Sequence, residues 1–157
     1  MAHHLSSYRL AAFRAATRLR RMTTPHASLT SPAAEEIEAL ARAAIADLPQ
    51  PYRLAAGQVA LRIEDFASDD MLAELGCESP FELTGLYDGI PLTEKSVLDQ
   101  PLQPDMIWLF RRPILDEWIE RGNVTLQELV THVLVHELAH HFGWSDDEIG
   151  AIDPWWE

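Results

Sequence analysis

The first long periodic run of apolar residues in the chain begins after Ser31. Proline follows this cap residue directly and acids occupy the first turn, which is typical of a helix start. Apolar residues then recur at helical spacing, at Ile37, Leu40, Ala41, Ala44, Ile45 and Leu48. Pro49 and Pro51 cannot continue a helix. The pattern therefore predicts a scaffold helix that starts at Ser31 and ends before Pro49.

Three segments in the middle of the chain have the patterns of strands. Residues 58–66 alternate between apolar and polar side chains. Residues 82–93 indicate a short strand, a turn at Asp88-Gly89 and a second extended piece. Residues 105–115 are more apolar and predict a strand that ends at Pro113, since proline suits an edge strand or a strand end.

Helical patterns return in the last third of the chain. A short helix is expected in residues 113–122, which end in glycine. A longer helix is expected to start at a capping box made by Thr125 and Glu128 and to stop at Gly143. The same start signal recurs in residues 145–152. This order of elements predicts an α+β domain with helices packed on one face of a small sheet.

Composition and charge limit the class of protein. The 157 residues are 47% apolar and 24% charged, as expected for one globular domain. Residues 1–30 hold five arginines and no acid, whereas residues 31–157 hold all 25 acids against seven basic residues. A body this acidic argues against nucleic-acid binding, which needs basic faces. We expect a basic extension in residues 1–30 and a single domain in residues 31–157.

Cysteine content and apolar runs narrow the location expected for the protein. One cysteine, Cys77, excludes an internal disulfide and a multi-cysteine zinc site, and it fits a reducing cytosol. The apolar runs are too short for a membrane span. Arginines interrupt the N-terminal segment, which lacks the apolar middle of a secretory signal. An organelle transit peptide and a basic amphipathic helix remain open for that segment. We predict a cytoplasmic protein without stable membrane insertion.

The candidate chemistry lies in residues 132–146, HVLVHELAHHFGWSD. His136 and His140 are four residues apart, so on a helix they share one face and can bind one ion at about 2.0–2.1 Å. Glu137 is the residue after His136, so its side chain points away from the face that His136 and His140 share. It can face a water molecule bound to the ion. This is the H-E-x-x-H motif, in which the glutamate is a general base.

The residues after the motif offer a third metal ligand. Gly143 ends the helix, so the chain can turn back and present the carboxylate of Asp146, six residues after His140. Catalytic zinc takes three protein ligands and water. Asp146 is alternatively an acid of the next helix, where the helix dipole favours it. In that case Asp147 and Glu148 are the alternative candidates for the third metal ligand.

Two further histidines, His132 and His141, stand at the wrong offsets for direct metal ligation. We expect each of them to be a surface group or a supporting partner of the ligands.

Three segments together resemble one known family: HELAHHFGWSD, ELTGLYDGIPLT and MIWLFRRPILDEW. They are similar to the small bacterial zincin-like family of predicted zinc-dependent proteases, over roughly residues 33–150. The resemblance implies a minimal zincin-like fold, a small twisted sheet packed with an N-terminal scaffold helix and a C-terminal active-site helix. It also implies one Zn²⁺ ion, with His136 and His140 as ligands, Glu137 as catalytic base and Asp146 as third ligand.

The chain departs from the larger zincin classes. None of the residues 147–157 is methionine, so we expect no Met-turn of the kind that the metzincins have. The sequence after Asp146 also contains no tyrosine or histidine that could stabilise an oxyanion. Tyr87, Arg111 and Arg112 could do so if the strands bring them near the motif.

We therefore expect a zinc-dependent peptide-bond hydrolase that acts on a peptide or a flexible protein segment. The strand MIWLF could align such a substrate by edge pairing. One alternative is a non-catalytic metal-binding or partner-binding module, with Trp155 and Trp156 as an aromatic contact or a lid on the core. A metal-dependent ribonuclease is the other alternative, and the glutamate of the motif and the acidic body argue against it.

Overall fold

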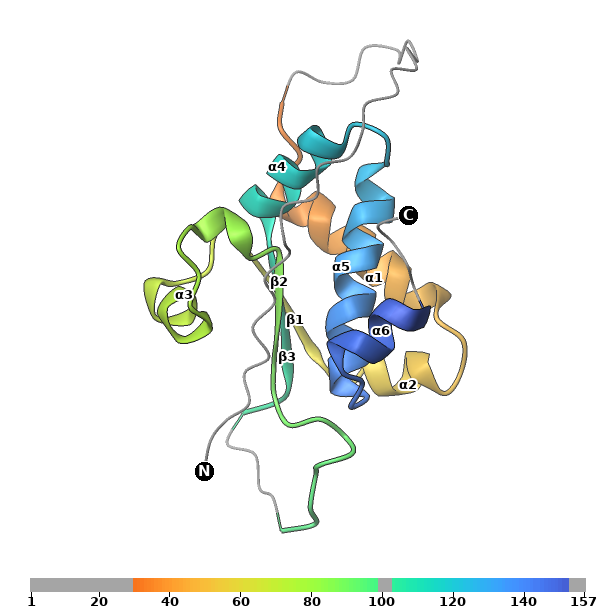
Figure 1. The fold of residues 1–157 in the computed structure, drawn as a ribbon. Coiled ribbons are helices and arrows are strands. Elements are labelled where there is room, and N and C mark those ends of the chain that lie inside the picture. Colours follow the sequence, from red (N-terminus) through yellow and green to blue (C-terminus); the bar gives the residue numbers. More distant parts are fainter. Residues whose placement is uncertain (1–29, 99–102, 153–157) are drawn as a thin grey trace.

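The computed structural model describes residues 30–98 and 103–152, and side chains as far as residue 149. The extension predicted for residues 1–30 lies, except for Thr30, outside the described residues, as do Trp155 and Trp156. Helices surround a small sheet (Figure 1). The elements are α1 (Ala34–Asp47), α2 (Tyr52–Ala56), β1 (Ala60–Glu64), α3 (Asp69–Leu75), η1 (Pro80–Glu82), β2 (Gly85–Asp88), β3 (Met106–Phe110), α4 (Arg111–Arg121), α5 (Leu126–His141) and α6 (Asp146–Ile152). The predicted α+β class is confirmed.

The strands of the sheet lie in the order β1-β3-β2. Trp108 of β3 pairs with Arg62 of the parallel strand β1 and with Leu86 of the antiparallel strand β2. Because β3 is the central strand, the edge-strand interpretation of Pro113 is wrong, and so is the expected edge pairing of this segment with a peptide. The strand also ends at Phe110 rather than Pro113. Pro113 lies in the first turn of α4, where its missing N–H removes no helical hydrogen bond.

Apolar side chains of β3 fill both faces of the sheet. Ile107 and Leu109 join α1 and α5 in the larger core, while Phe110 and Leu86 join α3 in a smaller one. Successive strand residues point to opposite faces, so the two cores lie on the two sides of the sheet. Helix α3, which the sequence pattern did not predict, therefore adds a partial cover on the second face, so the predicted packing of the helices on one face is wrong (Figure 1).

Helix α5 starts with the capping box that the sequence predicts, whereas the start of α1 differs from the prediction. Thr125 Oγ1 accepts the N–H of Glu128, whose carboxylate accepts the N–H of Thr125, which confirms the capping box of α5. Helix α1 differs, because it starts at Ala34 and the carboxylate of Glu36 caps its first turn. Ser31, the predicted cap, instead accepts a hydrogen bond from Arg111.

The segment that follows β2 leaves the sheet, so the second extended piece predicted up to residue 93 is wrong. The chain bends after Asp88, and the N–H of Glu94 donates to the carbonyl of Pro91 in a turn. The N–H of Leu92 then donates to the carbonyl of His141 at 2.8 Å. The segment is thereby fixed on the C-terminal end of α5.

No helix within the described residues combines the length and the apolar character that crossing a membrane requires.

Candidate metal and catalytic site

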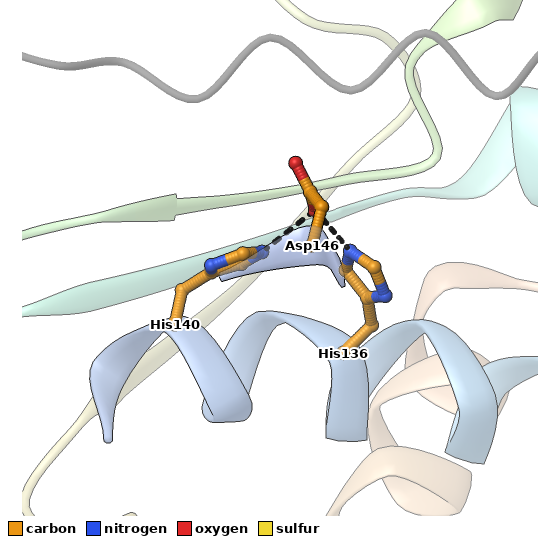
Figure 2. A group of neighbouring side chains, drawn as sticks. All are labelled: His136, His140 and Asp146. Carbon is orange, nitrogen blue, oxygen red and sulfur yellow. Dashed lines mark ion pairs between the residues drawn. The ribbon is translucent and has the colours of Figure 1, made fainter. Parts of the chain in front are cut away.

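Helix α5 and the start of α6 bring the three predicted metal ligands together. His136 and His140 lie one turn apart on α5, and their rings have centroids 5.1 Å apart. Asp146, the first residue of α6, points between them (Figure 2). Its Oδ1 lies 3.5 Å from Nε2 of His136 and 3.6 Å from Nε2 of His140.

This geometry suits a zinc ion. The three ligand atoms all lie within 4.8 Å of one another. Two ligands bound at about 2.1 Å with a tetrahedral angle are about 3.4 Å apart, close to the two measured separations. Two imidazoles and a carboxylate are also a donor set that zinc takes at catalytic sites. His136, His140 and Asp146 could therefore hold one zinc ion and leave a coordination position open.

The turn between α5 and α6 aims Asp146 at the histidines. Gly143 has φ +89°, a conformation that side-chain-bearing residues rarely adopt, and a Cβ at this position would collide with Thr93. The N–H of Gly143 donates to the carbonyl of His140, and that of Trp144 to the carbonyl of Ala139. Glycine is therefore needed here both for the backbone conformation and for the close approach of Thr93.

Alanine at this turn should disturb the metal ligands. We expect Gly143→Ala to raise the Kd for Zn²⁺ about tenfold or more, because displacing the turn moves Asp146, and outer contacts of metal ligands typically carry effects of about 10–100-fold. A chelator competition titration measures this. Gly76→Ala is the matched control, since Gly76 also has a positive φ but a Cβ added to it would meet no atom within 4 Å. Equal zinc affinity of the two variants would contradict the prediction.

Glu137 lies on the side of α5 that faces β2 and is buried, with 4% of its surface exposed. The backbone N–H of Tyr87 donates a hydrogen bond to its carboxylate. Its Oε2 has no hydrogen-bond partner among the described residues. A Cβ on Gly85 would lie 2.7 Å from Cγ1 of Val133 and 3.2 Å from Cγ of Glu137, so only glycine lets the strand approach this closely.

Burial controls the protonation of the site. It raises the pKa of Glu137 to about 8, against the hydrogen bond from Tyr87, and the charge of Asp146 adds to the increase. Burial also lowers the pKa of His140, although Asp146 and a hydrogen bond to the backbone of Trp144 favour the charged form. His140 is therefore neutral at neutral pH, which is the form that binds metal.

The shift at Glu137 predicts a pH dependence of stability. A carboxyl whose pKa rises from 4.5 in the unfolded chain to about 8 in the fold contributes stability below pH 4.5 and loses it as pH rises towards 8. We expect the melting temperature of the chelator-treated protein to fall between pH 5 and 8 relative to that of Glu137→Gln. The pKa values of His140 and His141 are lowered, so these residues make both proteins more stable as pH rises. Because this effect is the same in both proteins, the difference between their melting temperatures reports Glu137 alone. Parallel pH curves would contradict this.

The substitute ligands lie away from this centre. The carboxylate of Glu148 caps α6 through Ser145, and Asp147 is exposed. Among the described residues the group with metal-ligand geometry consists of His136, His140 and Asp146.

Neither of the other two histidines of α5 belongs to that group. The ring of His132 lies 6.2 Å from that of His136, between centroids. A surface position for His141 is wrong, because it is 2% exposed and contacts Tyr87. The sequence did contain a signal for the burial of His141. Val130, Leu134 and Glu137 precede it at offsets that place all four residues on one face of the helix, and all four are buried.

Of the three side chains considered for oxyanion stabilisation, Arg112 lies with its guanidinium over the ring of Phe66, 5.7 Å from the centroid, and the other two make polar contacts. Arg111 donates hydrogen bonds to Ser31, to the carbonyl of Pro32 and to Asp65. The hydroxyl of Tyr87 contacts Ile90 and His141. These contacts hold α1 and the segment after β2 in place, so an oxyanion role for either residue gains no support from them.

A sequence model of the zincin-like metallopeptidase family matches residues 56–156, which is more than half of the chain and includes the whole candidate site. The chain therefore belongs to the zincin-like metallopeptidase family, as its motifs indicated. Membership suggests metallopeptidase activity and implies zinc as the metal. A search among curated proteins found no match.

Proposed function

We propose that this protein is a zinc-dependent peptidase in which His136, His140 and Asp146 bind the ion and Glu137 is the general base. The observation that carries the proposal is the convergence of two imidazole nitrogens on one carboxylate oxygen at zinc-ligand separations, with a buried glutamate on the same helix. Family membership supports the same class of reaction.

The proposed roles follow from the contacts of each side chain. Zinc, when bound, lowers the pKa of a coordinated water and polarises a substrate carbonyl. The N–H of Tyr87 holds the carboxylate of Glu137, and Oε2, which has no hydrogen-bond partner among the described residues, would accept the proton of the attacking water. Glu137 then returns this proton to the amine nitrogen as the peptide bond breaks.

The position of β2 supports a peptide as substrate. The carbonyl of Thr84 accepts the N–H of Phe110, so Thr84 and Leu86 bond to β3, while Gly85 and Tyr87 direct their backbone groups to the outer edge. The N–H of Tyr87 reaches Glu137 from that edge. An extended peptide alongside β2 would therefore lie next to the proposed base, which moves the expected pairing from β3 to β2.

Metal analysis combined with a peptide-library assay tests this function. We expect about one zinc per chain and cleavage that a chelator stops and added zinc restores. Cleavage products are identified by mass spectrometry. Stoichiometric zinc without cleavage of any peptide would instead favour a non-catalytic module, and RNA cleavage lost with the metal would favour a ribonuclease.

A further inference from the structure

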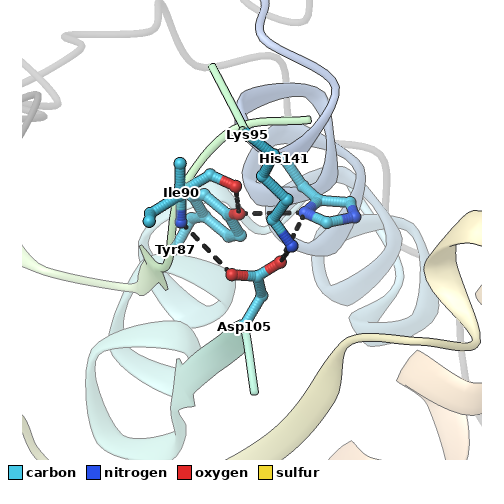
Figure 3. A network of polar contacts seen from close by, with 5 residues as sticks. All are labelled: Tyr87, Ile90, Lys95, Asp105 and His141. Carbon is cyan, nitrogen blue, oxygen red and sulfur yellow. Dashed lines mark hydrogen bonds and ion pairs between the residues drawn. The ribbon is translucent and has the colours of Figure 1, made fainter. Parts of the chain in front are cut away.

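A second polar cluster lies behind the proposed metal site. It consists of Tyr87 at the end of β2, Lys95 in the segment after it, Asp105 just before β3 and His141 at the end of α5 (Figure 3). The hydroxyl of Tyr87 lies 2.9 Å from Nδ1 of His141, and Oδ2 of Asp105 lies 3.6 Å from the same nitrogen. Lys95 forms an ion pair with Asp105. His141 and Asp105 are 2% and 8% exposed, so these two members of the cluster are buried, whereas Tyr87 is half-buried and Lys95 is exposed.

The polar groups of this cluster pair with one another. The single hydroxyl proton of Tyr87 goes to the carbonyl of Ile90, at 3.1 Å. In the tautomer of His141 that carries its proton on Nδ1, this N–H donates to the hydroxyl oxygen of Tyr87. Asp105 accepts the N–H of Ile90 at 3.2 Å through its other oxygen. Each partner is satisfied by the others, so loss of one leaves buried polar groups unpaired.

The cluster touches the proposed site at two places. The backbone N–H of Tyr87 donates to Glu137, and its hydroxyl contacts His141. One residue therefore joins the proposed base to the cluster. His141 directly follows His140 and accepts the N–H of Leu92 with its carbonyl. The cluster thus joins β2 to the last turn of α5.

The segment between Gly89 and Lys95 carries the connection on to the third ligand. A Cβ on Gly89 would lie 2.7 Å from the hydroxyl of Tyr87 and 2.9 Å from Cβ of Asp105, so the segment lies tightly on the cluster. At its other end Thr93 packs against Gly143, in the turn that aims Asp146 at the histidines. A displaced segment would move that turn.

We propose that Tyr87, Asp105 and His141 are positioning residues for the metal site. Together they hold the amide of Tyr87 on Glu137 and the segment after β2 against the Gly143 turn. In this way they set the distance between Asp146 and the two imidazoles. The inference rests on the proposed function only in requiring that the site binds zinc.

The test uses Tyr87→Phe and Asp105→Asn in the full chain. The first keeps the ring and the backbone amide on Glu137 but removes the hydroxyl, and the second keeps an acceptor oxygen but removes the charge opposite Lys95. We expect each variant to raise the Kd for Zn²⁺ about 10–100-fold in a chelator competition titration. We also expect the visible spectrum of the Co²⁺-loaded variants to change, because it reports the coordination geometry.

Ile114→Val in α4 is the control for general destabilisation, since Ile114 is fully buried in the larger core. It should lower the melting temperature and leave the Kd for Zn²⁺ and the Co²⁺ spectrum as in the wild type. Wild-type affinity and an unchanged spectrum in both Tyr87→Phe and Asp105→Asn would overturn the inference while the proposed function stands. A wild-type protein that binds no zinc would instead remove the proposed function, and this inference with it.

Discussion

Glu137→Gln should lower the rate of peptide hydrolysis by about 10²–10⁴-fold, the usual contribution of a positioned general base. Glutamine has nearly the same shape and can still accept the hydrogen bond from Tyr87 through its amide oxygen. It cannot take a proton from water near neutral pH, so the loss should appear in kcat. Because the three proposed ligands are untouched, zinc content should remain at about one ion per chain.

Steady-state kinetics on a peptide found in the library assay, with metal analysis of the same samples, measures both quantities. Glu128→Gln is the matched control, because Glu128 lies on the same helix but is exposed and caps its first turn. It should reduce stability slightly and leave kcat unchanged. A Glu137→Gln enzyme with wild-type kcat would show that another group activates the water.

The raised pKa of Glu137 is a property of the metal-free protein. The value of about 8 arises mainly from burial. A bound cation near a carboxylate favours the charged form and therefore lowers its pKa. Zinc would thus convert a costly buried carboxyl into a functional base, which links metal binding to the protonation of Glu137.

Local sequence signals predicted the parts of the site that depend on one helix. The spacing of His136 and His140 defines their relative position wherever α5 forms, and the capping box and Gly143 mark where it starts and stops. Even Asp146 depends only on a short turn. These features involve residues that are close together in the sequence, so the sequence alone predicts them.

The parts that could not be predicted depend on contacts between distant segments. Gly85 is needed because β2 lies on Val133 and Glu137 of α5, and Tyr87 meets His141 across 54 residues of chain. The central position of β3 has the same origin, since pairing with β1 and β2 on both sides is a property of the assembled sheet. A run of apolar residues indicates a buried strand but not its neighbours.

His136→Ala should reduce zinc content to near zero at micromolar metal and abolish hydrolysis, because two remaining ligands cannot hold a catalytic zinc ion tightly. Asp146→Asn should have a smaller effect, since an amide oxygen can still coordinate but lacks the charge. The order of zinc affinity is then wild type, Asp146→Asn and His136→Ala. Isothermal titration or chelator competition gives all three values.

His132→Ala distinguishes this ligand set from a line of three histidines along α5. His132 precedes His136 by one turn, but Asp146 is the group whose oxygen lies 3.5 and 3.6 Å from the two imidazole nitrogens. The ring centroids of His132 and His136 are 6.2 Å apart, further than those of His136 and His140. His132→Ala should therefore keep the wild-type Kd for Zn²⁺. A loss as large as that of His136→Ala, with wild-type affinity in Asp146→Asn, would place the third ligand on α5 instead.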